Sequence, residues 1–178
     1  MKKLIFIGAC SIFLAACNIT DKEVTEEVLD VKEDVEPAGI SKEVENGHFK
    51  LVVKSEKQNF ALDEPIVVTA ELHYLGSEQE MSVYSNATLI DYQLLSDDGN
   101  FELSSEGVDT ANKFVIPKNQ PYIETFEFDK KDESFGSLLD SMAAGSYTMK
   151  VEASYGVEGS QDEEDLATEI NFEVGGLD

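Results

Sequence analysis

The chain has 178 residues, with 13 lysine and arginine residues against 37 aspartate and glutamate residues, and its formal net charge is −24. Such an acidic chain repels phosphate backbones, so we expect no nucleic acid among its partners. Two cysteines are too few for a disulfide-dense scaffold or a cysteine zinc finger, and two histidines leave little material for a histidine-rich metal site. The length suits one domain preceded by short additional segments.

Residues 1–17 have the pattern of an export signal. Lys2 and Lys3 precede an apolar run over 4–14, which is shorter than the roughly 20 residues that a membrane-spanning helix needs. The run leads into Leu-Ala-Ala-Cys, ending at Cys17, and this motif resembles the lipobox of bacterial lipoproteins. The resemblance implies that the Cys17 thiol carries a diacylglycerol and that cleavage just before it makes Cys17 the mature N-terminus. The alternatives are an ordinary signal peptide that ends in cysteine, or a retained anchor helix.

The lipobox resemblance also implies where the protein works. Lipid on Cys17 would hold the chain to the outer side of the bacterial cell membrane, and a Gram-positive envelope is slightly favoured. Cys10 and two lysines would leave with the signal, so the mature chain would have 11 basic and 37 acidic residues and a net charge of −26. Anionic lipid headgroups repel such a chain, so we expect the domain to stand off the membrane surface.

Residues 18–47 are predicted to form an acidic flexible tether. The segment contains no aromatic residue and many like charges, a composition that favours a solvated chain. Val24, Val28, Val31 and Val35 form a helical stripe, but β-branched residues are mediocre helix formers. An amphipathic helix that binds a partner is the alternative interpretation. The folded domain is then expected to span 48–178.

From residue 48 onward, apolar residues alternate with polar ones, as they do in half-buried strands. We expect strands at 49–53, 66–74, 81–83, 90–94, 101–103, 114–116, 126–128, 147–155 and 166–174. Over 66–74 the alternation places Leu72 in the core and Glu71 and His73 on the solvent face. One short helix is expected from the helical spacing of Phe135, Leu138, Leu139 and Met142. About seven to nine strands without long helical crossovers predict an all-β, antiparallel two-sheet sandwich.

Two segments resemble known all-β domains. The stretch over 144–151, Ala-Gly-Ser-Tyr-Thr-Met-Lys-Val, resembles the Gly-x-Tyr segment of immunoglobulin-like domains, in which the tyrosine enters a late strand and packs over the core. Together with 59–68, which leads into a long strand, it makes the chain similar to immunoglobulin-like sandwiches of bacterial surface lipoproteins. A looser resemblance exists to the small all-β domain of the bacillar intracellular proteinase inhibitor. The likeness extends over 48–174 and supports the fold better than any activity, because such sandwiches host many functions.

The residues do not point to catalysis, and we expect the protein not to be an enzyme. His48 and His73 are the histidines, and no serine lies in a Gly-x-Ser-x-Gly elbow. Acid pairs for a carboxylate hydrolase are the enzyme-class alternative. A calcium site is another alternative, since hard oxygen ligands in loops suit Ca²⁺. Its candidate ligands surround a glycine turn or precede the last strand: Asp97, Asp98, Asn100, Asp162, Glu164 and Asp165. Apart from Ca²⁺, we expect no cofactor.

The sequence therefore predicts a membrane-anchored, non-enzymatic binding or accessory module. It would present loop tips or a sheet edge to another envelope protein or peptide, with contacts over 77–88, 104–121 and 156–165. The alternative is a protease inhibitor that acts through an exposed loop over 106–121, which contains Pro117 and Pro121.

Overall fold

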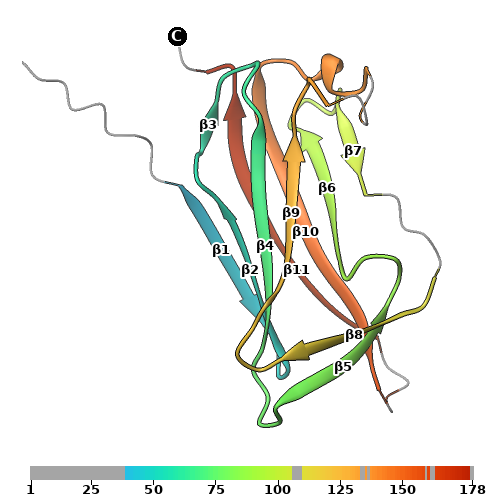
Figure 1. Ribbon diagram of the computed structural model, residues 1–178. Helices are drawn as coiled ribbons and strands as arrows, with labels where there is room; N and C mark the ends of the chain where they lie inside the picture. Colours follow the sequence, from blue (N-terminus) through green and yellow to red (C-terminus); the bar gives the residue numbers. More distant parts are fainter. Residues whose placement is uncertain are drawn as a thin grey trace, which may run out of the picture. The chain divides into compact units, whose positions relative to one another are not determined.

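The computed structural model describes residues 39–105, 110–132, 135, 137–158, 160 and 163–176. Eleven strands and a 3₁₀ helix, η2 (Leu139–Ser141), lie within these residues. The strands are β1 (Ile40–Glu45), β2 (Phe49–Ser55), β3 (Asn59–Phe60), β4 (Ile66–Tyr74), β5 (Glu80–Ser85), β6 (Ile90–Ser96), β7 (Glu102–Ser104), β8 (Asn112–Pro117), β9 (Tyr122–Phe128), β10 (Gly145–Val157) and β11 (Glu163–Val174). They form two sheets that pack face to face (Figure 1), which confirms the all-β two-sheet sandwich.

The first sheet has the strand order β1-β2-β4-β9, and all its pairings are antiparallel. β4 lies at its centre, with Leu72 opposite Leu51 on one side and opposite Tyr122 on the other. The side chains of β4 alternate as the sequence predicts: Leu72 is 0% exposed, and its neighbours Glu71 and His73 face outward. This sheet ends at β1 on one side and at β9 on the other.

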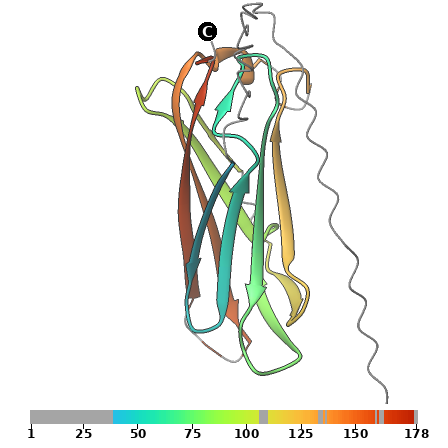
Figure 2. The same ribbon diagram turned by 90° about the vertical axis from the view of Figure 1, so that its left-hand side faces the viewer.

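The second sheet is built around the long hairpin of β10 and β11, which Figure 2 shows from the side. β10 pairs with β6 along most of its length and with β5 only through Gly156 and Val157. Two further strands extend the sheet: β7 pairs with β6, the strand before it in the chain, and β8 pairs with β5, to which it is not adjacent in the chain. β3 pairs in parallel with β11, so the sheet is mixed rather than purely antiparallel.

Aromatic rings fill much of the space between the two sheets. The Tyr92 ring lies 4.9 Å from that of Phe126 and 5.2 Å from that of Phe128, which joins β6 to β9 across the core. Tyr147, the tyrosine of the Gly-x-Tyr segment, is 2% exposed, and its hydroxyl donates a hydrogen bond to the Ala143 carbonyl at 2.7 Å. Because this hydroxyl is satisfied, the ring can be buried without an orphaned polar atom.

The structure adds two strands to the nine expected ones, β1 and β3, and the first corrects the predicted domain boundary. The segment 18–47 was expected to be a flexible tether, but Ile40–Glu45 pairs with β2 along its full length. Ile40 and Val44 are half-buried against the core, while the residues between them face solvent. An edge strand needs only one hydrogen-bonded neighbour and one apolar side, so its sequence signal is weak. The sandwich therefore begins at β1, and 18–38 lie outside the described residues.

Where the short helix was predicted, the described residues form no α-helix: Leu139–Ser141 form the 3₁₀ turn η2, and Phe135 before it is also in 3₁₀ conformation. Leu139 and Met142 are buried, as the helical spacing requires, but Leu138 is 43% exposed. Short 3₁₀ turns are common connectors, and here one links β9 to β10 without the length of an α-helix.

The side chain of Asn46 attaches the turn between β1 and β2 to the second sheet. Its Oδ1 accepts hydrogen bonds from the backbone N–H groups of His48 and Phe49 at 2.9 and 2.8 Å. Its Nδ2 donates to Tyr155 Oη on β10 at 2.8 Å and to Glu164 Oε2 on β11 at 2.9 Å. Burial raises the pKa of the Tyr155 hydroxyl above its usual value. The Asn46 amide thus links the two sheets at the end of β1 that is far from Ile40.

We expect Asn46→Ala to lower the free energy of unfolding by about 1–3 kcal/mol, because two backbone N–H groups lose their acceptor and the buried Tyr155 hydroxyl keeps only its hydrogen bond to Glu164. Urea denaturation followed by tyrosine fluorescence measures this change. Asn119→Ala in the exposed β8–β9 turn is the control, with an expected change within about 0.5 kcal/mol. Equal stabilities of the two variants would contradict the role of Asn46.

Candidate binding surfaces

The predicted lipid attachment site, Cys17, and the signal sequence lie outside the described residues. No helix in the part of the chain that the structure describes is long and apolar enough to cross a bilayer. The described chain enters the sandwich at Gly39, beside Ser55 and Glu56. Lipid attachment therefore stays a prediction from the sequence.

The turn that contains Asp97, Asp98 and Asn100 uses its polar groups to hold its own conformation. Asp98 Oδ1 accepts hydrogen bonds from Ser96 Oγ at 2.7 Å and from Asn100 N at 3.0 Å, and Oδ2 accepts one from Asn100 Nδ2 at 2.7 Å. These donors, Ser96 first, hold the pKa of Asp98 below its usual value. Gly99 completes the turn with a φ of 74°, a left-handed conformation that favours glycine.

The remaining calcium candidates do not gather around this turn. Glu164 lies on β11 and accepts the hydrogen bond from Asn46, and Asp165 is exposed beside it, opposite Ser154. Asp162 lies outside the described residues. Over the described ranges, no three His, Cys, Asp or Glu side chains come together closely enough to hold a metal ion. A calcium site thus stays a prediction without a cluster to support it.

Both histidines lie next to carboxylates at the surface. His48 Nε2 is 3.8 Å from Glu164 Oε1, and His73 Nε2 is 2.9 Å from Glu71 Oε2. His73 lies on the outer face of β4, as the sequence predicts. His48 lies in the turn between β1 and β2, where the sequence predicts the end of a tether.

The segments expected to form contact loops are in large part strands. β5 occupies the middle of 77–88, and β8 occupies much of 104–121. β8 is paired with β5 from Asn112 to Pro117, so these residues do not form the exposed loop that a protease inhibitor would insert. The alternation of Phe114 and Ile116 predicts a strand, but the sequence did not reveal its partner. Residues 106–109 lie outside the described part of the chain.

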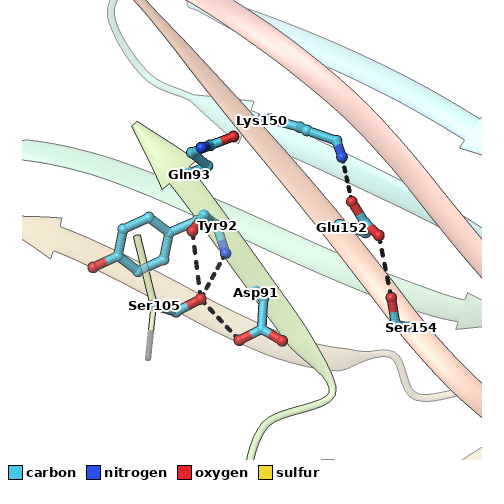
Figure 3. A pocket seen from close by; sticks show the side chains of 7 residues that line it. All are labelled: Asp91, Tyr92, Gln93, Ser105, Lys150, Glu152 and Ser154. Atoms are coloured by element: carbon cyan, nitrogen blue, oxygen red, sulfur yellow. Dashed lines mark hydrogen bonds and ion pairs between the residues drawn. The ribbon is translucent and has the colours of Figure 1, made fainter. Parts of the chain in front are cut away.

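A polar pocket of about 290 Å³ lies on the outer face of the second sheet, over β6 and β10 (Figure 3). Polar and charged side chains dominate its lining: Asp91, Tyr92, Gln93, Ser105, Lys150, Glu152 and Ser154. β6 and β10 supply six of these residues, and Ser105 follows directly after β7.

Strand register places two carboxylates face to face in this pocket. Asp91 on β6 lies opposite Glu152 on β10, and Gln93 lies opposite Lys150. Side chains directly opposite each other on one face have Cβ atoms about 4.5–5.5 Å apart, and like charges in such a pair destabilise a sheet. The Asp91–Glu152 pair therefore costs stability unless neighbouring groups compensate for it.

Neighbouring groups offset part of this charge. Asp91 Oδ1 accepts hydrogen bonds from Thr88 Oγ1 and Ser105 Oγ, both at 2.8 Å, and Glu152 forms an ion pair with Lys150. Within the described residues, no hydrogen bond reaches Asp91 Oδ2. The pocket consequently presents one carboxylate oxygen, next to a second carboxylate, to a hydrogen-bond donor from outside.

Ser105 also fixes one wall of the pocket. Its N–H donates to the Tyr92 carbonyl at 3.0 Å, and the Tyr92 N–H donates to Ser105 Oγ at 3.0 Å. Just beyond the end of β7, the Ser105 side chain thus accepts the hydrogen bond that a backbone carbonyl of a neighbouring strand would otherwise accept from Tyr92. Burial raises the pKa of Tyr92, whose ring packs into the core behind the pocket.

The sequence did not single out this pocket. Alternation over 90–94 and 147–155 predicts which side chains face outward, Asp91 and Glu152 included, but not that the two strands are neighbours. Because the pair forms across 61 positions of sequence, only the strand order could have revealed it. The sequence does place an acidic residue at an outward position of each strand. With 37 acidic residues in the chain, these two did not stand out from the others.

A second concave site, a groove of about 390 Å³, lies on the first sheet beside the β2–β3 turn. Lys54 Nζ lies 2.7 Å from Glu71 Oε1 across β2 and β4, and Lys57 forms an ion pair with Glu64. Val67, which is 40% exposed, provides apolar surface between these pairs. Both lysines are thus already paired with carboxylates, and the groove has no excess of positive charge.

Glu71, which lines this groove, is expected to contribute to stability in a pH-dependent way. The hydrogen bond from Lys54, and then that from His73, lowers the pKa of Glu71 from 4.5. A carboxyl whose folded pKa is lower than its unfolded pKa stabilises the fold above the unfolded value, and this contribution is lost as the pH falls through the folded pKa. We expect Glu71→Gln to cost up to about 1 kcal/mol at pH 7. The difference from wild type should begin to shrink near pH 4.5 and disappear once the pH has fallen through the lowered pKa of Glu71 in the folded protein.

Urea denaturation of both proteins between pH 3 and pH 7 measures this difference, and a repeat in about 1 M salt, which screens charges beyond about 3 Å, should reduce it. A difference of the same size at every pH would show that packing, not charge, determines the effect.

Comparison with known proteins identifies no family. No family model matches the chain, and no curated protein matches it. Among solved structures, the chain is similar to Northeast Structural Genomics Consortium target SoR45, whose X-ray structure is known. The TM-score is 0.44 and the sequence identity is 16%, and the match covers 75% of this chain and 92% of that chain.

Proposed function

We propose that this protein is a non-enzymatic binding module, held on the outer side of the bacterial cell membrane by lipid on Cys17, that recognises another protein or peptide of the cell envelope. The Leu-Ala-Ala-Cys motif supports the location, because it combines a short apolar run with a cysteine at the exit of an export signal. The sandwich supplies a rigid scaffold on which outward side chains of adjacent strands can form a recognition surface.

The observation that carries the binding role is the carboxylate pair in the pocket of Figure 3. Asp91 and Glu152 lie directly opposite each other, and no hydrogen bond from a described residue reaches Asp91 Oδ2. A partner that places an N–H or ammonium group between them would satisfy that oxygen and relieve the repulsion. The pocket therefore favours partners that carry hydrogen-bond donors, lysine and arginine side chains above all.

Crosslinking and affinity capture from native membranes, with the lipidated protein as bait, test this proposal. The key variant is the double change Asp91→Asn and Glu152→Gln, which removes two charges from the pocket at nearly constant size. We expect a dominant envelope partner to be captured at least about tenfold less by this variant, since each charge-assisted hydrogen bond contributes about 1.5–3 kcal/mol.

The matched control is Asp165→Asn with Glu169→Gln. These two acids are exposed on the same outer face, on β11, and do not line the pocket. The control should capture the partner as the wild type does. Equal capture by both double variants would assign the partner to another surface, and no partner above background in the wild type would remove the proposal.

A further inference from the structure

The edges of the two sheets differ in how well they are protected against pairing with another chain. Natural proteins protect edges with short strands, proline, lysine or bulges. β3 and β7 are two and three residues long, and β8 contains Lys113 and Pro117. β1 includes Lys42 among its charged residues. Four edge strands of the described chain therefore carry at least one such device.

Two edges of the described chain are long and contain neither proline nor lysine: β11, whose outer side is paired only at Glu173 and Val174, and β9. Of these two, β9 is the one that no described strand covers on its outer side. It has seven residues, Tyr-Ile-Glu-Thr-Phe-Glu-Phe, without proline or lysine, and its register with β4 runs unbroken from Tyr122 to Phe128. Aromatic and β-branched residues make up most of it, which favours the extended conformation. On its far side no described strand is paired with it, so alternate residues direct backbone N–H and C=O groups outward.

The outward side chains of β9 form a surface with apolar and polar parts that a partner strand could contact. Ile123 is 55% exposed, the highest value among the large hydrophobic residues of the described chain, and Thr125 and Glu127 follow it on the same face. Glu124 points to the other side, where its Oε2 accepts a hydrogen bond from Tyr122 Oη at 2.8 Å. The edge thus presents an apolar, a hydroxyl and an acidic side chain in that order.

We propose that β9 is a docking edge to which an extended segment of a partner protein adds as a new strand, with a basic residue opposite Glu127 and an apolar residue opposite Ile123. Main-chain hydrogen bonds to the free edge would supply the affinity, and the alternating side chains the specificity, as in other cases of strand addition. The inference concerns a different sheet from the pocket of Figure 3, so either surface can fail its test without the other.

Charge decides between a partner strand and a second copy of this chain. Two copies, each with a net charge of −24, repel each other. An antiparallel β9–β9 pair centred on Thr125 would set Ile123 opposite Glu127 twice, an apolar side chain against an acid. A segment with lysine or arginine opposite Glu127 forms instead a favourable cross-strand pair.

The probe is a capped heptapeptide, Thr-Lys-Thr-Thr-Thr-Val-Thr, which in antiparallel register sets lysine opposite Glu127 and valine opposite Ile123. Hydrogen exchange of the full chain in detergent micelles locates where it binds. At a peptide concentration about nine times the dissociation constant, the outward amides of 122–128 should exchange about tenfold more slowly, because only the free protein exchanges them. The amides of β8 should not change.

Two altered peptides test the chemistry of the contact. Replacing lysine by glutamate should weaken binding about fivefold, since one opposite-charge pair becomes a like-charge pair. Replacing the central threonine by proline should abolish binding, because proline cannot donate to the ladder or continue a strand there.

A pair of protein variants provides the matched control. Ile123→Lys places a protecting charge on β9, and Val115→Lys makes the same kind of change on β8, where Val115 is 49% exposed. The first should abolish protection of 122–128 by the lysine peptide, and the second should leave it intact. Protection at another edge, equal loss in both variants, no protection at all, or a doubling of the particle mass without peptide would each overturn the proposal.

Discussion

Replacing Leu72 by alanine is expected to lower the free energy of unfolding by about 2–5 kcal/mol, because it removes a fully buried side chain and leaves a cavity. Leu72 is 0% exposed at the centre of the first sheet, opposite Leu51 on β2 and Tyr122 on β9. Three strands thus lose contacts at once, and a sheet paired on both sides cannot collapse easily into the gap. Urea or thermal denaturation measures the effect.

Val67→Ala is the control for this variant. Val67 lies on the same strand but on the opposite face and is 40% exposed, so its truncation should change stability by about 0.5 kcal/mol or less. A cost below about 1 kcal/mol for Leu72→Ala would mean that the two sheets do not pack on β4 as described.

Replacing Cys17 by serine is expected to release the protein from membranes or to leave it unprocessed, since no thiol remains to take the lipid. A lipid chain contributes about 0.8 kcal/mol for each buried CH₂ group, so under the lipoprotein interpretation a cleaved chain without lipid loses its attachment to the membrane. Fractionation of cells into membrane and soluble parts, with the mass of the mature N-terminus, measures both outcomes.

Cys10→Ser is the matched control, because Cys10 lies within the signal and would leave with it. This variant should stay on the membrane with an unchanged mature mass. A correctly cleaved Cys17→Ser protein that remains on the membrane would contradict the lipoprotein interpretation and point to a different anchor.

The sequence predicts the long strands well because apolar and polar side chains alternate along most of their length. In β4, β10 and β11 nearly all large apolar residues fall on every second position, with the exposed Val67 as an exception, and burial follows the same alternation. Tyr147 is the clearest case, since its expected position over the core is where the ring lies. A period of two decides the face of a residue without any knowledge of its partners.

Strand partners and edges could not be predicted in the same way. β1 has only Ile40 and Val44 as apolar residues in an acidic segment, and its pairing with β2 decides its conformation. Glu71 shows the same limit at the level of one side chain: the alternation places it on the outer face, but its contacts with Lys54 and His73 depend on which strands are neighbours and on local side-chain positions. Long-range pairing overrides local preference in both cases.

The attachment of β1 has a mechanical consequence. The chain enters the sandwich at Ile40, and the Asn46 side chain fastens the other end of β1 to β10 and β11. Consider a force that pulls on the chain before Ile40 while the end of the domain at Asn46 is held. This force acts parallel to β1, so it loads the six residue pairs between β1 and β2 together, in shear. Bonds that share a load in this way resist it far better than bonds that are opened one after another. If lipid on Cys17 anchors the chain as proposed, drag on the far end of the domain would be transmitted to the anchor without peeling the domain open.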